Sequence, residues 1–265
     1  MTSATPAILV LAGRRSATTD PLAARAGVSH KAMVPVGGEA MVGRVLRIAA
    51  EAFPDSRLYV SVDDPAAIAG EPTVAGLGEL GRIEVVEARA NIVDSVVAAS
   101  RVTGFPLLIT TADNVLMTAE GMRSIVAAGG AGEADAIVMM AERRDILAAH
   151  PDGQRRFYAF RGGAYSNCNL FWLGSDRALK ATDSFRLGGQ FAKHKRRAVK
   201  ALGLATLFLF LSRLLTLEGM FRHLSRRFGV RIRPLVAPDG RLAIDVDNER
   251  TFRVAEELLA RGASG

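Results

Sequence analysis

The sequence has one cysteine and few aromatic residues. Cys168 is the single cysteine among 265 residues, so no disulfide can form within the chain and a reducing compartment is expected. Aromatic residues make up 6% of the chain, which leaves few side chains for stacking against unpaired bases. We therefore expect no nucleic-acid partner, although a basic, non-catalytic nucleic-acid-binding protein stays open as an alternative of a different class.

Histidine and targeting signals are also scarce. The four histidines show no metal-ligand spacing, and the sequence has no Ser-His-Asp or Cys-His arrangement typical of a catalytic nucleophile. The segment before the first apolar run carries no positive side chain. The sequence therefore predicts no secretory signal and a cytoplasmic location.

Long apolar runs are absent, and the longest is Ala201–Leu211. It is too short for a bilayer span, which needs about 20 apolar residues. The run predicts a buried helix. The basic cluster Lys193–Arg197 just before it leaves a second interpretation open, a helix that rests peripherally on an anionic membrane surface.

What the chain does have is the composition of an ordered, basic globular protein. Hydrophobic residues make up 49% and charged residues 23%, and 265 residues suffice for one large α/β domain. The net charge of +7 favours anionic partners such as phosphorylated small molecules, nucleic acid or anionic lipid. No pattern in the sequence indicates an oligomeric state.

Short apolar runs alternate with helical patterns in the first half of the chain. Ala7–Leu11 predicts a buried strand, and Ala40–Phe53 predicts an amphipathic helix. Such βαβ units predict a three-layer αβα, Rossmann-like α/β fold with a mostly parallel sheet, whose ligands bind at the carboxyl ends of the strands. The alternation continues with strands over Arg57–Val62, Ile83–Glu87, Phe105–Thr111 and Ala136–Ala141 and helices over Ile92–Ser100 and Ala119–Ala128.

The second half predicts paired strands and a long helical stretch before the strands return. No repeat or low-complexity linker interrupts it, so we expect a single domain over residues 1–265. It comprises a core (1–142), an inserted lobe (143–229) and return strands with a C-terminal helix (230–265). The expected elements are strands over Arg156–Arg161, Tyr165–Leu173, Arg231–Val236 and Leu242–Val246, a helical stretch over Ser184–Arg227 and a helix over Glu249–Arg261.

A glycine and two arginines follow the first predicted strand directly, in the segment LAGRRSATTDPLAARAGVSHK. Small residues up to Gly13 let a ligand approach the backbone closely, and Arg14 and Arg15 can neutralise phosphate oxygens. Lys31 at the end of the loop would add a mobile point charge on the same anion. The loop suits a triphosphate, although a plain surface connection stays open.

Carboxylates occur at two other predicted strand ends. Asp113 follows the strand that ends at Thr111, and Asp245 and Asp247 occupy alternate positions, so that on a strand both would point to one face. Carboxylates gathered in this way need a cation, and Mg²⁺ held by carboxylates and phosphate oxygens is the expected cofactor. A helix cap or a turn is the alternative interpretation of each segment.

These segments occur in an order that resembles a known family. LAG with a basic loop, HKAMVPVGGEAMVGRVL, TTADN and AIDVDNERTF resemble the nucleotidyltransferases related to molybdenum cofactor guanylyltransferase, an NTP-transferase group with a glycosyltransferase-A-like Rossmann fold. The resemblance covers roughly residues 6–142 and 230–260. The chain departs from the family pattern where Arg14 replaces a second glycine and where Asn248–Arg250 replaces Thr-Pro-Glu.

The resemblance implies a Mg²⁺-dependent transfer of a nucleoside monophosphate from an NTP to a phosphorylated small molecule, with release of pyrophosphate. The acceptor's own phosphate oxygen would attack, so no general base is needed. A glycosyltransferase of the same fold that uses a nucleotide sugar is the alternative. The resemblance makes residues 1–142 the nucleotide-binding core and residues 143–229 the acceptor-binding lobe. The implied residues are Arg15, Lys31 and Asp113 for catalysis; Leu11, Ala12, Gly13, Arg14, Asn91 and Ser95 for the nucleotide; Asp113, Asp245 and Asp247 for the metal; and Asn167 and Asn169 for a sugar, polyol or cofactor phosphate as acceptor.

Separately from the resemblance, Lys195 in the basic cluster Lys193–Arg197 is a candidate for the acceptor's phosphate. A solvated helix end is the alternative for this cluster, a polar edge strand for the two asparagines and a helix cap for Asn91.

Overall fold

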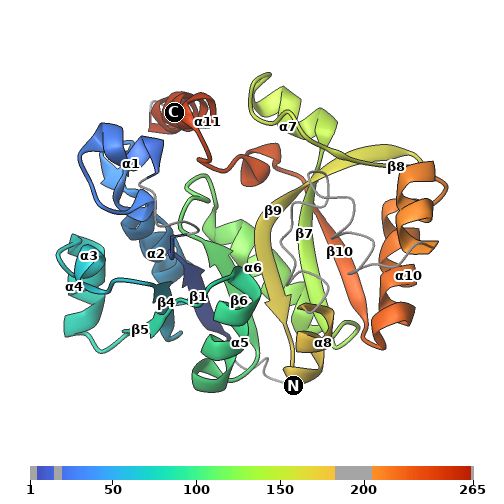
Figure 1. Ribbon diagram of the computed structural model, residues 1–265, viewed down its shortest axis with the longest axis horizontal. Coiled ribbons are helices and arrows are strands. Elements are labelled where there is room, and N and C mark those ends of the chain that lie inside the picture. The colour runs from blue at the N-terminus through green and yellow to red at the C-terminus, as the bar shows by residue number, and fades with distance from the viewer. Residues whose placement is uncertain (1–4, 15–19, 183–204, 264–265) are drawn as a thin grey trace.

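The structure is a computed structural model that describes residues 5–14, 20–182 and 205–263 (Figure 1). Its centre is an eight-stranded sheet in the order β10-β7-β9-β6-β1-β4-β5, with β8 paired to β9 outside this path. β1, β4, β5 and β6 run parallel, as do β7 and β10, whereas β9 runs antiparallel to β6 and β7. The predicted, mostly parallel sheet is confirmed. Its strands are β1 (Ala7–Leu11), β4 (Leu58–Val62), β5 (Ile83–Glu87), β6 (Leu107–Thr111), β7 (Ala136–Glu142), β8 (Tyr158–Phe160), β9 (Gly163–Leu173) and β10 (Ile232–Ala237).

Helices cover both faces of this sheet, which accounts for the apolar runs of its strands. Ile8 and Val10 pack into one core with α2, α4 and α6, whereas Leu9 packs into a second core with α5 and α10. All residues of β4 and β6 are buried, as expected where both faces of a parallel sheet are covered. These helices are α2 (Met41–Ala52), α4 (Pro72–Glu79), α5 (Ile92–Thr103), α6 (Ala119–Gly130) and α10 (Leu217–Phe228).

Shorter elements connect these layers. None of the helices within the described ranges is both long and apolar enough to cross a membrane. The connecting elements are α1 (Pro21–Ala26), the 3-10 helix η1 (Lys31–Met33), β2 (Pro35–Val36), β3 (Glu39–Ala40), α3 (Ala66–Ala69), α7 (Arg143–Ala149), η2 (Asp176–Ala178), α8 (Leu179–Thr182) and η4 (Gly240–Ala243), followed by the last helix α11 (Glu249–Ala263).

The predicted strand over Leu242–Val246 is wrong. The 3-10 helix η4 forms instead, because the Asp239 carboxylate accepts a hydrogen bond from Arg241 N at 2.9 Å and caps the turn. The residues that follow η4 are irregular until α11 begins. The expectation that Asp245 and Asp247 share one face of a strand is therefore wrong as well.

The predicted helical stretch over Ser184–Arg227 is interrupted. Residues 183–204 lie outside the described residues. A helix over 205–212 ends before Arg213, which has a φ of 55°. Thr216 then caps α10 by accepting a hydrogen bond from Gly219 N at 3.1 Å. The described part of this stretch is thus two helices joined by a tight turn.

Candidate active site

A cleft of about 330 Å³ opens at the carboxyl ends of β1, β4, β5 and β6. This is the edge of the sheet at which the sequence predicted a ligand. Asn167, Asn169 and Asp245 are not part of the cleft wall, and Arg15 and Lys195 lie outside the described residues. The wall brings together the predicted residues Leu11, Ala12, Gly13, Arg14, Lys31, Asn91, Ser95, Asp113 and Asp247.

Gly13 lies where the end of β1 approaches the chain that follows β5. A Cβ atom at this position would lie 2.7 Å from the Cβ of Ala88, closer than two side-chain carbons can approach. Just before it, Ala12 N donates a hydrogen bond of 2.8 Å to the Ser61 carbonyl oxygen and continues the pairing of β1 with β4. The packing of the cleft wall therefore requires the glycine, independently of any ligand.

We expect Gly13→Ala to lower the free energy of unfolding by about 1–3 kcal/mol, the usual cost of overpacking a filled site. Urea denaturation measures the change. Gly76→Ala is the matched control, because a Cβ there meets nothing within 4 Å and alanine favours the helix α4. Equal stability of Gly13→Ala and the parent protein would contradict this account of the wall.

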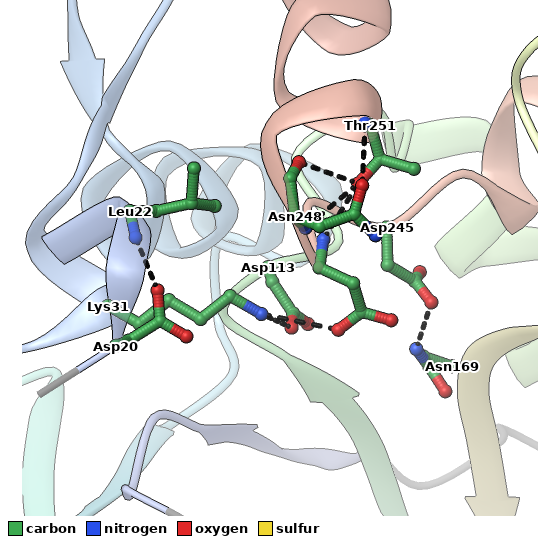
Figure 2. A network of polar contacts seen from close by, with 9 residues as sticks. Asp20, Leu22, Lys31, Asp113, Asn169, Asp245, Asn248 and Thr251 are labelled. Atoms are coloured by element: carbon green, nitrogen blue, oxygen red, sulfur yellow. Dashed lines mark hydrogen bonds and ion pairs between the residues drawn. The ribbon is translucent and has the colours of Figure 1, made fainter. Parts of the chain in front are cut away.

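The Lys31 ammonium group lies between two carboxylates of the cleft (Figure 2). Its Nζ is 2.6 Å from Oδ2 of Asp113 and 3.3 Å from Oδ1 of Asp247. Asp113 follows β6, whereas Asp247 belongs to the irregular segment before α11. That segment is held beside β6 because Val246 N donates to the Asp113 carbonyl oxygen at 3.0 Å. Three parts of the chain thus place one cation and two anions at a single point.

Asp245 points toward β9 rather than toward Lys31. Its Oδ2 accepts a hydrogen bond of 2.6 Å from Nδ2 of Asn169 (Figure 2). Asn169 has a φ of 48°, in the left-handed region, and its backbone N donates to Oδ1 of Asn167 at 3.0 Å. The register of β9 against β7 shifts in this stretch, which is a β-bulge. The two asparagines predicted for the acceptor therefore lie together, beside Asp245.

Sequence reasoning missed Asp63, which follows β4 as Asp113 follows β6. Its Oδ1 accepts a hydrogen bond from Arg14 N at 3.0 Å, and its Oδ2 accepts one from Arg14 Nε at 2.7 Å. Nε2 of the buried His30 lies 3.6 Å from the same carboxylate. Arg14 is thus held against the cleft wall by Asp63. The signal that would have identified Asp63 is its position directly after a buried strand.

The pKa of the Asp63 carboxyl lies below its usual value of 3.8. Partial burial would raise this pKa, but the hydrogen bonds from the backbone and guanidinium of Arg14 outweigh the burial. The ion pair therefore contributes stability that is fully present above about pH 4 and is lost as pH falls through the lowered pKa.

We expect the free energy of unfolding to fall in this acid range, and Asp63→Asn to make that fall shallower. The reason is that the asparagine side chain does not titrate, so one of the groups that takes up protons on unfolding is lost. Urea denaturation between about pH 3 and pH 5 measures both slopes. Identical slopes for the variant and the parent protein would contradict the lowered pKa.

Asn91 and Ser95 shape the loop that precedes α5. Oδ1 of Asn91 accepts a hydrogen bond from Asp94 N at 2.9 Å and caps the helix. Oγ of Ser95 accepts one from Arg89 N at 2.8 Å and donates to the Asn91 carbonyl oxygen at 3.1 Å. Both side chains therefore order this part of the cleft wall, and their contact with a nucleotide base stays a prediction.

A glycine turn, a lysine and converging carboxylates at the carboxyl ends of a mostly parallel sheet define an α/β nucleotidyltransferase. Residues 8–203 match the MobA-like NTP transferase domain, and the chain belongs to this family. The resemblance indicated by the sequence motifs is confirmed. No curated protein matches the sequence significantly.

Solved structures share the fold. A hypothetical transferase from Thermus thermophilus is 24% identical, with a TM-score of 0.75 over 93% of this chain and 99% of that one. The CMP:2-keto-3-deoxy-manno-octonic acid synthetase in complex with CTP is 12% identical, with a TM-score of 0.60 over 98% and 100% of the two chains. Rv0371c from Mycobacterium tuberculosis H37Rv is 18% identical, with a TM-score of 0.54 over 96% and 99%. At these identities the similarity shows the fold.

Proposed function

We propose that the protein transfers a nucleoside monophosphate from an NTP to a phosphorylated small molecule, such as a sugar, polyol or cofactor phosphate, and releases pyrophosphate. The observation that carries this proposal is the convergence of Lys31, Asp113 and Asp247 in the cleft that the Gly13 turn also lines. One neighbour in fold is a synthetase in complex with CTP, which is consistent with an NTP as the donor.

The carboxylates around Lys31 fit Mg²⁺. Oδ2 of Asp113 and Oδ1 of Asp247 already converge on one cation, the Lys31 ammonium. In the part of the chain that the structure describes, no group of three or more His, Cys, Asp or Glu side chains could hold a metal by itself. Two carboxylates completed by substrate phosphate oxygens are a usual Mg²⁺ environment. Asp245, whose carboxylate accepts a hydrogen bond from Asn169, would have to turn toward Asp247 to act as the predicted third ligand.

A bound Mg²⁺ would neutralise negative charge on the phosphates during transfer. The chain's own residues position the reactants. The backbone at Gly13 lines the cleft and could lie beside a triphosphate, and the Lys31 ammonium, between Asp113 and Asp247, would contribute positive charge near its phosphate oxygens. Arg14 is held at the end of β1 by its hydrogen bonds to Asp63, which follows β4.

The reaction needs no general base from the chain. An oxygen of the acceptor phosphate forms a bond to the α-phosphorus, and the bond between that phosphorus and the pyrophosphate oxygen breaks. A phosphate monoester has its second pKa near about 6, so its attacking oxygen is already ionised at neutral pH. Catalysis then depends on positioning of the reactants and on charge neutralisation, for which Lys31 and the metal-binding carboxylates of the cleft are the candidates.

Asn167 and Asn169 are our candidates for binding the acceptor. Both lie on the half-buried face of β9, and Asn169 reaches Asp245 two residues before Asp247. Side-chain amides donate and accept hydrogen bonds and therefore suit the hydroxyl groups of a sugar or polyol. Lys195, the candidate for the acceptor's phosphate, lies outside the described residues.

Pyrophosphate release tests the proposed reaction. The protein is incubated with Mg²⁺, each common NTP and a panel of sugar, polyol and cofactor phosphates, with Asp113→Asn as the control. We expect pyrophosphate only when one NTP and one acceptor are present together. A thermal-shift screen with the same compounds selects the pair, because a ligand that binds the native state raises its stability. Consumption of a nucleotide sugar without pyrophosphate release would instead support a glycosyltransferase.

A further inference from the structure

The helix described over residues 205–212 packs against the protein mainly through apolar side chains. The Phe210 ring contacts Tyr158 and Phe160 edge-on, with ring centroids 5.9 and 5.8 Å apart. Oγ1 of the buried Thr206 lies 2.8 Å from Nε2 of His223 on α10. These contacts tie the helix to β8 and α10, so its orientation is fixed.

The outer side of the same helix is also apolar. Phe208 is 65% exposed and Leu211 is 62% exposed, and the two are three residues apart, on one helical face. Leu214, in the turn that follows, is 55% exposed. The side of a helix that faces water normally carries polar residues, as Ser212 does here, so three exposed large apolar side chains in one short stretch call for a partner surface.

Exposed arginines lie within and after this apolar segment of the chain. Arg213 lies between Leu211 and Leu214 and is exposed, as are Arg222, Arg226 and Arg227 on the neighbouring helix α10. Within residues 205–230, Glu218 is the one acidic residue against these four arginines. α10 lies at the edge of the molecule beside β8 and β10, on the side away from α3 and α4 (Figure 1).

We propose that the apolar-basic face, defined as Phe208, Leu211, Leu214, Arg213 and Arg222, docks on the surface of an anionic lipid bilayer. Large apolar side chains would enter the boundary between headgroups and acyl chains, while the arginines would contact anionic headgroups. A second copy of the chain fits this face less well, because a symmetric contact would bring the same arginines together.

The proposed contact leaves the nucleotide cleft open. None of the five residues of the apolar-basic face lines that cleft. Membrane docking and nucleotidyl transfer can therefore be tested separately, and failure of one leaves the other standing.

Co-sedimentation with vesicles tests the proposal. The full-length protein is mixed with vesicles of phosphatidylcholine alone or with phosphatidylglycerol added, at low and high salt. We expect binding only to the anionic vesicles, weakened by salt. Phe208→Ser/Leu211→Ser should lower the partition coefficient at least about tenfold, because two large apolar side chains no longer enter the bilayer.

Matched variants show whether vesicle binding depends on this face or on exposed apolar and basic residues in general. Leu80→Ser/Val102→Ser removes two apolar residues that are 71% and 54% exposed elsewhere, and should leave binding unchanged. Arg213→Gln/Arg222→Gln should weaken binding about fivefold per arginine, whereas Arg101→Gln/Arg123→Gln, at exposed arginines on other helices, should weaken it less.

Three outcomes would overturn the proposal. The first is that the parent protein does not bind anionic vesicles at low salt. The second is that Leu80→Ser/Val102→Ser loses as much vesicle binding as Phe208→Ser/Leu211→Ser does. The third is that the parent protein binds no vesicles but self-associates, and that Phe208→Ser/Leu211→Ser abolishes this self-association. Circular dichroism and thermal unfolding of each variant show whether it folds. Pyrophosphate release, where the parent protein shows it, should be unchanged in the Phe208→Ser/Leu211→Ser variant.

Discussion

Asp113→Asn is expected to abolish nucleotidyl transfer, by about 10³-fold or more, while the protein stays folded. The side chain is 11% exposed and lies beside the Lys31 ammonium at 2.6 Å. Asparagine has nearly the same shape but no charge, so it keeps the packing and removes one of the two carboxylates that fit the metal. Pyrophosphate release at saturating NTP measures the effect, and thermal unfolding verifies the fold.

Two further substitutions provide a second test of the metal site and a control. Asp247→Asn should behave as Asp113→Asn does, because its carboxylate meets the same ammonium group at 3.3 Å. Asp55→Asn is the matched control, since Asp55 is exposed in a loop that does not line the cleft. Near-full activity of Asp113→Asn in the presence of Mg²⁺ would remove the central claim about this site.

The sheet and the position of the cleft could be predicted from the sequence because both depend on local patterns. A strand buried on both faces is a short apolar run, so β1 begins and ends as predicted, and β4 begins one residue later than predicted. Parallel strands end at the same edge of the sheet. Gly13 after β1 and Asp113 after β6 therefore had to lie near each other, and the register of these strands pairs Leu11 with Thr111.

The geometry of the C-terminal segment could not be predicted, because distant parts of the chain decide it. The alternation of apolar and acidic residues over Ala243–Asp247 is typical of a strand. No neighbouring strand pairs with this segment in the described structure, and Val246 N bonds instead to the Asp113 carbonyl oxygen. Asp247 consequently meets Lys31, while Asp245 meets Asn169 on β9.

The position of Asp63 directly after β4 could have been predicted, but its pairing with Arg14 could not. It is 49 residues away from Arg14 in the sequence, and the contact depends on the pairing of β1 with β4. The sequence alone left Arg14 as a free cation for phosphates. In the structure its guanidinium pairs with Asp63, whereas the Lys31 ammonium pairs with Asp113 and Asp247, the two carboxylates that fit the metal. Lys31 is therefore the cation that lies at the proposed metal site itself.

Lys31→Ala is expected to lower kcat by about 10²-fold or more, with a smaller effect on the KM for NTP. Negative charge builds on the pyrophosphate oxygens as the bond to the α-phosphorus breaks, so a preorganised ammonium stabilises the transition state more than the bound NTP. Steady-state kinetics with varied NTP separates the two constants. A raised KM with an unchanged kcat would show that Lys31 only holds the ground-state phosphate.

The same variant has a second expected effect, which does not depend on turnover. Lys31 neutralises Asp113 and Asp247 in the absence of substrate, at 2.6 and 3.3 Å. Removing it leaves two carboxylates that repel each other, so Lys31→Ala should bind a divalent cation more tightly than the parent protein when no NTP is present. Mn²⁺ binding followed by electron paramagnetic resonance measures this, with Lys180→Ala, at an exposed lysine of α8, as the control. If Lys31→Ala changes neither kcat nor KM and leaves Mn²⁺ affinity as it was, the lysine belongs to a surface connection, and the glycine loop before it does not bind a triphosphate.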